Sequence, residues 1–208
     1  MTHPAEAWHD AEEDAEAVAR VLTTLDPAEW TVYRDVRWPT REFASLDHVV
    51  VGPKGVFVID SLKWSGRLTV ANEQVRLNGS VRDSELVGAG EAAAAVTALV
   101  GFGARDVQPV LCFVREEWLT GTARDVLVCS TANLDTMLLG RSARLRPEQI
   151  RVANRGLAEW QRASDRSSRP TVVAPVTPLS GRTVPLSLVI LGVALLAVLV
   201  LGVLLLGA

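Results

Sequence analysis

The last 25 residues of the chain, 184–208, contain no charged side chain. Within them the run LSLVILGVALLAVLVLGVLLLG (186–207) would span about 33 Å as a helix, close to the thickness of a bilayer's hydrocarbon core. A helix buried in a soluble domain would need a polar stripe along one side, and this segment has none. The sequence therefore predicts a single transmembrane helix over residues 186–207.

The remainder of the chain has the composition of a globular domain. The whole sequence is 49% apolar and 22% charged, with a formal net charge of −3 and two cysteines. Without the apolar C-terminal segment the apolar share falls to about 45%, which is normal for a folded domain. These values exclude a disordered chain and a disulfide scaffold, and with the apolar segment they exclude a wholly soluble protein.

Arginine distribution predicts the side of the membrane on which the domain lies. Several arginines in residues 162–182 precede the apolar segment, and no charged residue follows it. By the positive-inside bias, we expect a single-pass cell-membrane protein whose N-terminal domain is cytoplasmic. The first 20 residues are acidic and lack an apolar core, so we expect no signal peptide. Cys112 and Cys129 are then expected to be reduced and buried.

Hydrophobic periodicity predicts an α/β or α+β domain over residues 1–163, followed by a flexible linker rich in Ser, Pro and Arg over residues 164–185. We expect a helix opened by a Ser84 cap, and strands rich in valine on either side of a Gly-Pro-Lys-Gly turn. The predicted helices cover residues 10–24, 84–101, 131–139 and 147–163. The predicted strands cover residues 30–38, 45–52, 55–62, 67–70, 74–77, 107–114 and 125–130.

The hairpin over residues 45–62 places two carboxylates together. With Pro53 and Lys54 in the loop, opposed residues have numbers that sum to 107, so Asp47 faces Asp60. Such neighbours have Cβ atoms about 5 Å apart, and their like charges repel unless a cation or a shared proton compensates. Hard oxygen ligands at this spacing favour Mg²⁺ or Mn²⁺. The alternative is that both aspartates are solvated strand ends, and His48, on the opposite face, is interpreted as structural.

The stretch LDHVVVGPKGVFVIDSLKWSGRL (46–68) resembles the nuclease-related domain (NERD) family, a branch of the PD-(D/E)XK nuclease superfamily. Similarity is closest over residues 30–67 and continues more loosely to about residue 140. The resemblance implies a restriction-endonuclease-like core, a mixed sheet flanked by helices, with a divalent-metal site for phosphodiester cleavage in DNA or RNA. Asp47 and Asp60 match the family's two acidic strand ligands.

The lysine of the family pattern is displaced in this chain. The family has an acid-x-Lys motif, whereas this sequence has Asp60-Ser61-Leu62-Lys63. Strand alternation puts Leu62, and not Lys63, on the face of Asp60. Lys63 would reach the site only through a bulge or a twist at the strand end.

The glutamate that the family carries on its first helix is also displaced. The corresponding position here is Ala15, with Glu16 beside it and Glu12 one turn earlier. The resemblance implies that Glu16 or Glu12 could take the place of this glutamate, as a catalytic group or a metal ligand.

These observations predict a membrane-anchored, metal-dependent nuclease in which Asp47 and Asp60 bind Mg²⁺ or Mn²⁺. Lys63 would orient water or stabilise charge on the phosphate, and Glu12 or Glu16 would complete the site. The two displaced residues favour an alternative, a catalytically degenerate module that binds nucleic acid or a protein partner at the membrane. A third possibility is a structural role in a membrane complex, with the aspartates serving only the fold.

Overall fold

The computed structural model describes residues 4–41 and 44–168 of the 208 residues. The predicted transmembrane helix, residues 186–207, lies outside this part. Of the linker predicted over residues 164–185, residues 164–168 belong instead to a helix, Pro147–Ser168, and the remainder lies outside the described residues. No helix among the described residues is long and apolar enough to cross a membrane.

The domain is built on a six-stranded mixed sheet with the strand order β1-β2-β3-β7-β9-β8. Strands β1, β2 and β3 are antiparallel to one another, β3, β7 and β9 are parallel, and β8 closes the far edge antiparallel to β9. The strands are β1 Thr31–Arg37, β2 Ser45–Gly52, β3 Gly55–Leu62, β7 Val107–Phe113, β8 Thr120–Ala123 and β9 Val126–Ser130. The periodicity predicted an α/β or α+β domain, and the mixed sheet with flanking helices is the form that the family resemblance implied.

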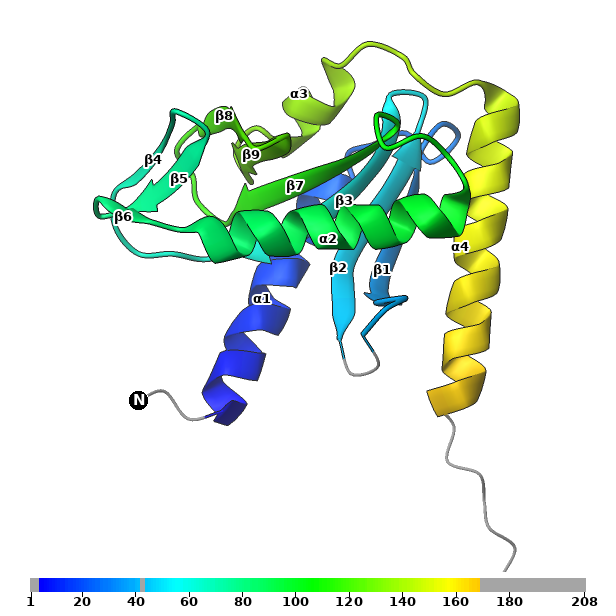
Figure 1. Cartoon of the computed structure of the whole chain (residues 1–208), viewed down its shortest axis with the longest axis horizontal. Coiled ribbons are helices and arrows are strands. Elements are labelled where there is room, and N and C mark those ends of the chain that lie inside the picture. The colour runs from blue at the N-terminus through cyan, green and yellow to red at the C-terminus, as the bar shows by residue number, and fades with distance from the viewer. Residues whose placement is uncertain (1–3, 42–43, 169–208) are drawn as a thin grey trace, which may run out of the picture. The chain divides into compact units, whose positions relative to one another are not determined.

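Helices cover both faces of this sheet (Figure 1). On one face, Val49, Val51, Val56 and Val58 pack against α2 (Asp83–Val100) and α4 (Pro147–Ser168). On the other face, residues that alternate with these valines, including Val50 and Phe57, pack against α1 (Pro4–Leu22) and α3 (Leu134–Leu139). Because both faces are covered, the hairpin strands are almost continuously apolar.

A small three-stranded sheet lies beside the main one, formed by β4 Leu68–Ala71, β5 Gln74–Leu77 and β6 Ser80–Val81. The two short strands β6 and β8 were not predicted, since neither SV nor TGTA carries an apolar alternation. The predicted Ser84 cap is wrong. Arg82 occupies the cap position of α2 without a side-chain cap, and the Ser84 hydroxyl donates instead to Glu85 at 2.6 Å.

Two packing details follow from the parallel strands and the hairpin. Cys112 and Cys129 oppose each other on β7 and β9, and both are free thiols with no exposed surface.

Gly52 ends β2 beneath the ring of Trp30, where an added Cβ would lie 2.2 Å from a ring carbon. Only glycine leaves room for this tryptophan to pack directly on the strand.

Candidate carboxylate site

The β2–β3 hairpin has the register predicted from its loop. Gly52 opposes Gly55 and His48 opposes Ile59, so that the numbers of opposed residues sum to 107. The backbone pairing ends at His48 and Ile59, and the same count carried one position further sets Asp47 opposite Asp60. Here the Asp47 side chain, in place of a backbone carbonyl, links the two strands: the backbone N–H of Ser61 donates to its Oδ2 at 2.8 Å.

Asp47 and Asp60 line one cavity of about 120 Å³. Helix α2 closes it with Glu85 and with small residues three, four and seven positions later, Gly88, Ala89 and Ala92. This spacing keeps them on one face of the helix, and small side chains there leave space over the strands. The other described residues of its lining are Trp38, Arg41, Ser45, Leu46, Val58 and Ile59.

Burial raises the pKa of both aspartates in the cavity, and neighbouring carboxylates add to this effect. Burial, and next the charge of Asp47, raises the pKa of Asp60 to about 7; the N–H of Ser61 opposes this shift and Glu85 adds to it. Burial also raises the pKa of Asp47, against the hydrogen bond from Ser61. Asp60 is nevertheless an exposed residue of β3, so solvent reaches its carboxyl although protein atoms crowd around it.

Among the described residues of the cavity wall, Arg41 alone carries a positive charge. Its guanidinium lies over the Trp38 ring, 4.3 Å from the centroid, and forms an ion pair with Glu91. Lys63 is exposed just beyond the end of β3 and is not among the described lining residues. Leu62, which stands where the family pattern has lysine, is partly buried and packs against a cluster that contains Leu86.

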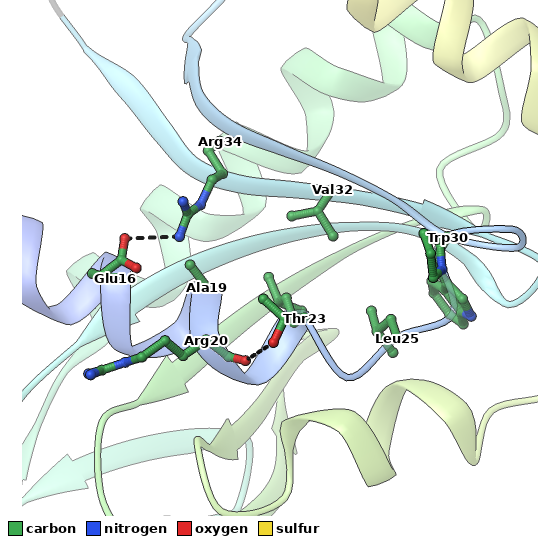
Figure 2. A pocket seen from close by; sticks show the side chains of 10 residues that line it. Glu16, Ala19, Arg20, Thr23, Leu25, Trp30, Val32 and Arg34 are labelled. Atoms are coloured by element: carbon green, nitrogen blue, oxygen red, sulfur yellow. Dashed lines mark hydrogen bonds and ion pairs between the residues drawn. The ribbon is translucent and has the colours of Figure 1, made fainter.

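The glutamates of the first helix lie on the other side of the sheet. Glu16 pairs with Arg34 at 2.9 Å, and Arg34 opposes His48 on the face that α1 covers. Glu16 lines a separate cavity of about 410 Å³, with charged groups at one end and Leu25 and Trp30 at the other (Figure 2). Glu12 is exposed on the same helix, one turn earlier. The structure thus brings Asp47 and Asp60 together but does not bring Glu12 or Glu16 to them.

The donor set of the cavity suits a hard divalent cation. Carboxylate oxygens are the ligands that Mg²⁺ and Mn²⁺ prefer, and a cation would offset the burial that is the main reason why both aspartate pKa values are raised. Within residues 4–41 and 44–168, however, no three Asp, Glu, His or Cys side chains are arranged as a metal-holding group. The two aspartates therefore fit an ion that keeps several of its waters, as Mg²⁺ usually does.

A match to a protein-family model shows the family to which this chain belongs. A family model described as the nuclease-related domain matches residues 7–114, slightly more than half of the chain. The chain belongs to the nuclease-related domain family. The matched region runs from α1 through β7 and contains the hairpin with both aspartates. Comparisons with curated proteins and with solved structures found no match.

Glu85, Trp38 and Arg41 are cavity residues that the sequence did not predict. The signal for Glu85 was present in its helical spacing, since Gly88, Ala89 and Ala92 follow it on one face. No comparable signal marks Trp38 or Arg41, which come from the segment between β1 and β2.

Proposed function

We propose that this member of the nuclease-related domain family hydrolyses phosphodiester bonds of nucleic acid with Mg²⁺ or Mn²⁺ at the Asp47–Asp60 cavity. The observation that carries the proposal is the shared cavity of the two aspartates, with the pKa of Asp60 raised to about 7. We further propose that residues 186–207 anchor the chain in the cell membrane as a single-pass helix, with the domain in the cytoplasm.

Each side chain of the cavity has a role in this proposal. Asp47, oriented by the N–H of Ser61, and Asp60 would hold the cation. A bound divalent cation would supply an activated water and would neutralise charge on the scissile phosphate. Arg41 would donate to a phosphate oxygen from the cavity wall, the role that the sequence assigned to Lys63 at the strand end. Glu85 would accept a hydrogen bond from water on the α2 side.

Two observations favour the alternative, a catalytically degenerate module that binds nucleic acid or a protein partner at the membrane. Leu62 contributes to apolar packing where the family has lysine. Glu16 is engaged by Arg34 on the opposite face of the sheet. If these two losses abolish turnover, the carboxylate cavity would retain only a binding role.

The test is cleavage of end-labelled DNA and RNA by the full chain in non-ionic detergent, with Mg²⁺, Mn²⁺ or a chelator. We expect metal-dependent cleavage that disappears in Asp47→Asn and Asp60→Asn. Asp125→Asn is the matched control, because Asp125 is an exposed turn residue with φ of 64°, a conformation that asparagine also adopts. Cleavage that survives in both cavity variants would remove the proposal, and a wild-type chain that binds but never cuts would support the degenerate module.

A further inference from the structure

The structure assigns a second, phosphate-binding site to Arg141 and Arg144, and we infer that it holds a backbone phosphate of the nucleic acid away from the carboxylate cavity. The inference rests on the proposed function for its ligand, but its geometry is independent of Asp47 and Asp60. Arg141 and Arg144 follow the end of α3 and precede α4.

The site is a polar cavity of about 460 Å³. It has two guanidinium groups and two hydroxyl groups, and none of its described lining residues is acidic. These residues are Thr136, Met137, Gly140, Arg141, Ser142 and Arg144. A planar guanidinium donates paired hydrogen bonds to phosphate oxygens, and serine and threonine hydroxyls can add further donors.

Arg141 has hydrogen-bonding capacity that the described part of the chain leaves unused. Its Nε is buried and has no hydrogen-bond partner there. Buried donors are normally satisfied, because an unsatisfied one loses its hydration without compensation. Neither Arg141 nor Arg144 forms an ion pair with a described residue. A bound phosphodiester oxygen would satisfy the donor, and its single negative charge would offset part of the charge of the two guanidinium groups.

Hydrogen bonds fix the segment that carries Arg144, which lines the same cavity as Arg141. The N–H groups of Arg144 and Leu145 both donate to the carbonyl of Pro53, at 2.8 and 3.1 Å, and the Arg144 guanidinium donates to the carbonyl of Arg105. The pKa of Arg141 is lowered, chiefly by burial and then by the charge of Arg144. Like charges held together without a carboxylate partner are typical of an anion site.

The segments around this cavity carry three cations, Lys54, Arg105 and Arg146, and an equal number of carboxylates, so the positive charge is that of the lining itself. The hydrogen bonds to Pro53 and Arg105 bring the loops that carry Lys54 and Arg105 to this cavity, and Arg146 follows it in the chain. Three carboxylates lie in or beside these segments, and two of them are engaged. Asp135 accepts from the N–H of Thr136, Glu148 pairs with Arg151, and Asp106 follows Arg105.

Nucleic acid is the occupant that the charge pattern favours. The chain has a net charge of −3, so a polyanion must be held by a local group of cations rather than by a general basic surface. This cavity provides such a group, and the carboxylate cavity lies at the other end of β3, about 17 Å along the strand from its first residue. A nucleic acid of several nucleotides is long enough to reach both.

The test measures binding of a labelled oligonucleotide by fluorescence anisotropy, with the full chain in detergent and a chelator present to prevent cleavage. We expect Arg141→Gln and Arg144→Gln to weaken binding by about fivefold or more, and to reduce the slope of log affinity against log salt by about one each. Arg151→Gln is the matched control, because Arg151 is exposed and already paired with Glu148. Inorganic phosphate should raise the melting temperature of the wild-type chain more than that of the double variant.

Equal affinity and equal salt slope in Arg141→Gln and Arg151→Gln would overturn the inference. The nucleic-acid assignment would be overturned in favour of a lipid headgroup by two results together. Short-chain phosphatidic acid would raise the melting temperature of the wild-type chain but not of Arg141→Gln, and the oligonucleotide would not bind. The same measurements on Asp60→Asn separate this inference from the proposed function. If binding depends on Arg141 and Arg144 but the wild-type chain cleaves nothing, the phosphate-binding site is supported and the proposed nuclease activity is not. If the wild-type chain cleaves nucleic acid but binding does not depend on these arginines, the nuclease activity is supported and the phosphate-binding site is not.

Discussion

The ionisation of Asp60 makes the stability of the domain depend on pH in a direction that can be derived. Its pKa is about 7 in the folded chain and 3.8 in the absence of perturbation. The folded state therefore binds more protons than the unfolded state between these values, and stability falls as the pH rises from about 4 through 7. Below pH 4 the contribution is complete, and above pH 7 it is lost. Asp47 shifts in the same direction.

The magnitude follows from the shift and from the exposure of the side chain. A shift of about 3 units corresponds to about 4 kcal/mol for a fully buried group. Because Asp60 is an exposed residue, solvent screening reduces the expected effect to about 1–2 kcal/mol. Asp60→Asn removes the titrating group, so the wild-type chain should lose about 1–2 kcal/mol relative to this variant between pH 4.5 and pH 8.

The assay is urea unfolding of both chains, followed by tryptophan fluorescence at the two pH values without divalent cations. Comparing the wild type with Asp60→Asn cancels the contributions of other groups, including His48, whose pKa burial lowers to about 4. Adding Mn²⁺ at pH 8 should restore the lost stability in the wild type alone. A difference between the two chains that does not change with pH would refute the electrostatic reasoning.

Four substitutions test the placement of side chains. Leu62→Lys should raise Mg²⁺-dependent cleavage, because it places a cation on the face of Asp60. It should also lower the free energy of unfolding by about 1–2 kcal/mol, since Leu62 packs in an apolar cluster. Unchanged cleavage would show that the displaced lysine does not limit the activity. Glu85→Gln should reduce cleavage, because Glu85 lines the carboxylate cavity. Glu16→Gln breaks only an exposed ion pair worth under about 1 kcal/mol and should leave cleavage unchanged. A larger loss of cleavage in Glu16→Gln than in Glu85→Gln would contradict the proposed site. Gly52→Ala should destabilise the domain by about 2–3 kcal/mol in urea unfolding because its Cβ meets the Trp30 ring, and a near-neutral result would show that the ring can move.

The hairpin was predictable because its determinants are local. Gly-Pro-Lys-Gly defines the loop, the valines on either side alternate between faces, and the register then follows by counting. The juxtaposition of Asp47 and Asp60 needs no information from elsewhere in the chain. Leu62 could be placed on the face of Asp60 by the same counting.

The rest of the cavity depends on tertiary packing. Helical periodicity shows that α1 has an apolar side but does not show which face of the sheet it covers, so the position of Glu16 could not be derived. Glu85 approaches the aspartates only because small residues let α2 lie over β2 and β3. Arg41 comes from an irregular segment whose course no periodicity describes.

The central claim is that Asp47 and Asp60 together hold one divalent cation. Its most direct test is titration of the full chain with Mn²⁺ at pH 8, monitored by electron paramagnetic resonance of the free ion. We predict about one bound ion per chain, an affinity at least about tenfold lower in Asp47→Asn and in Asp60→Asn, and no change in Asp125→Asn. Absence of binding, or the same affinity in all four chains, would contradict the claim.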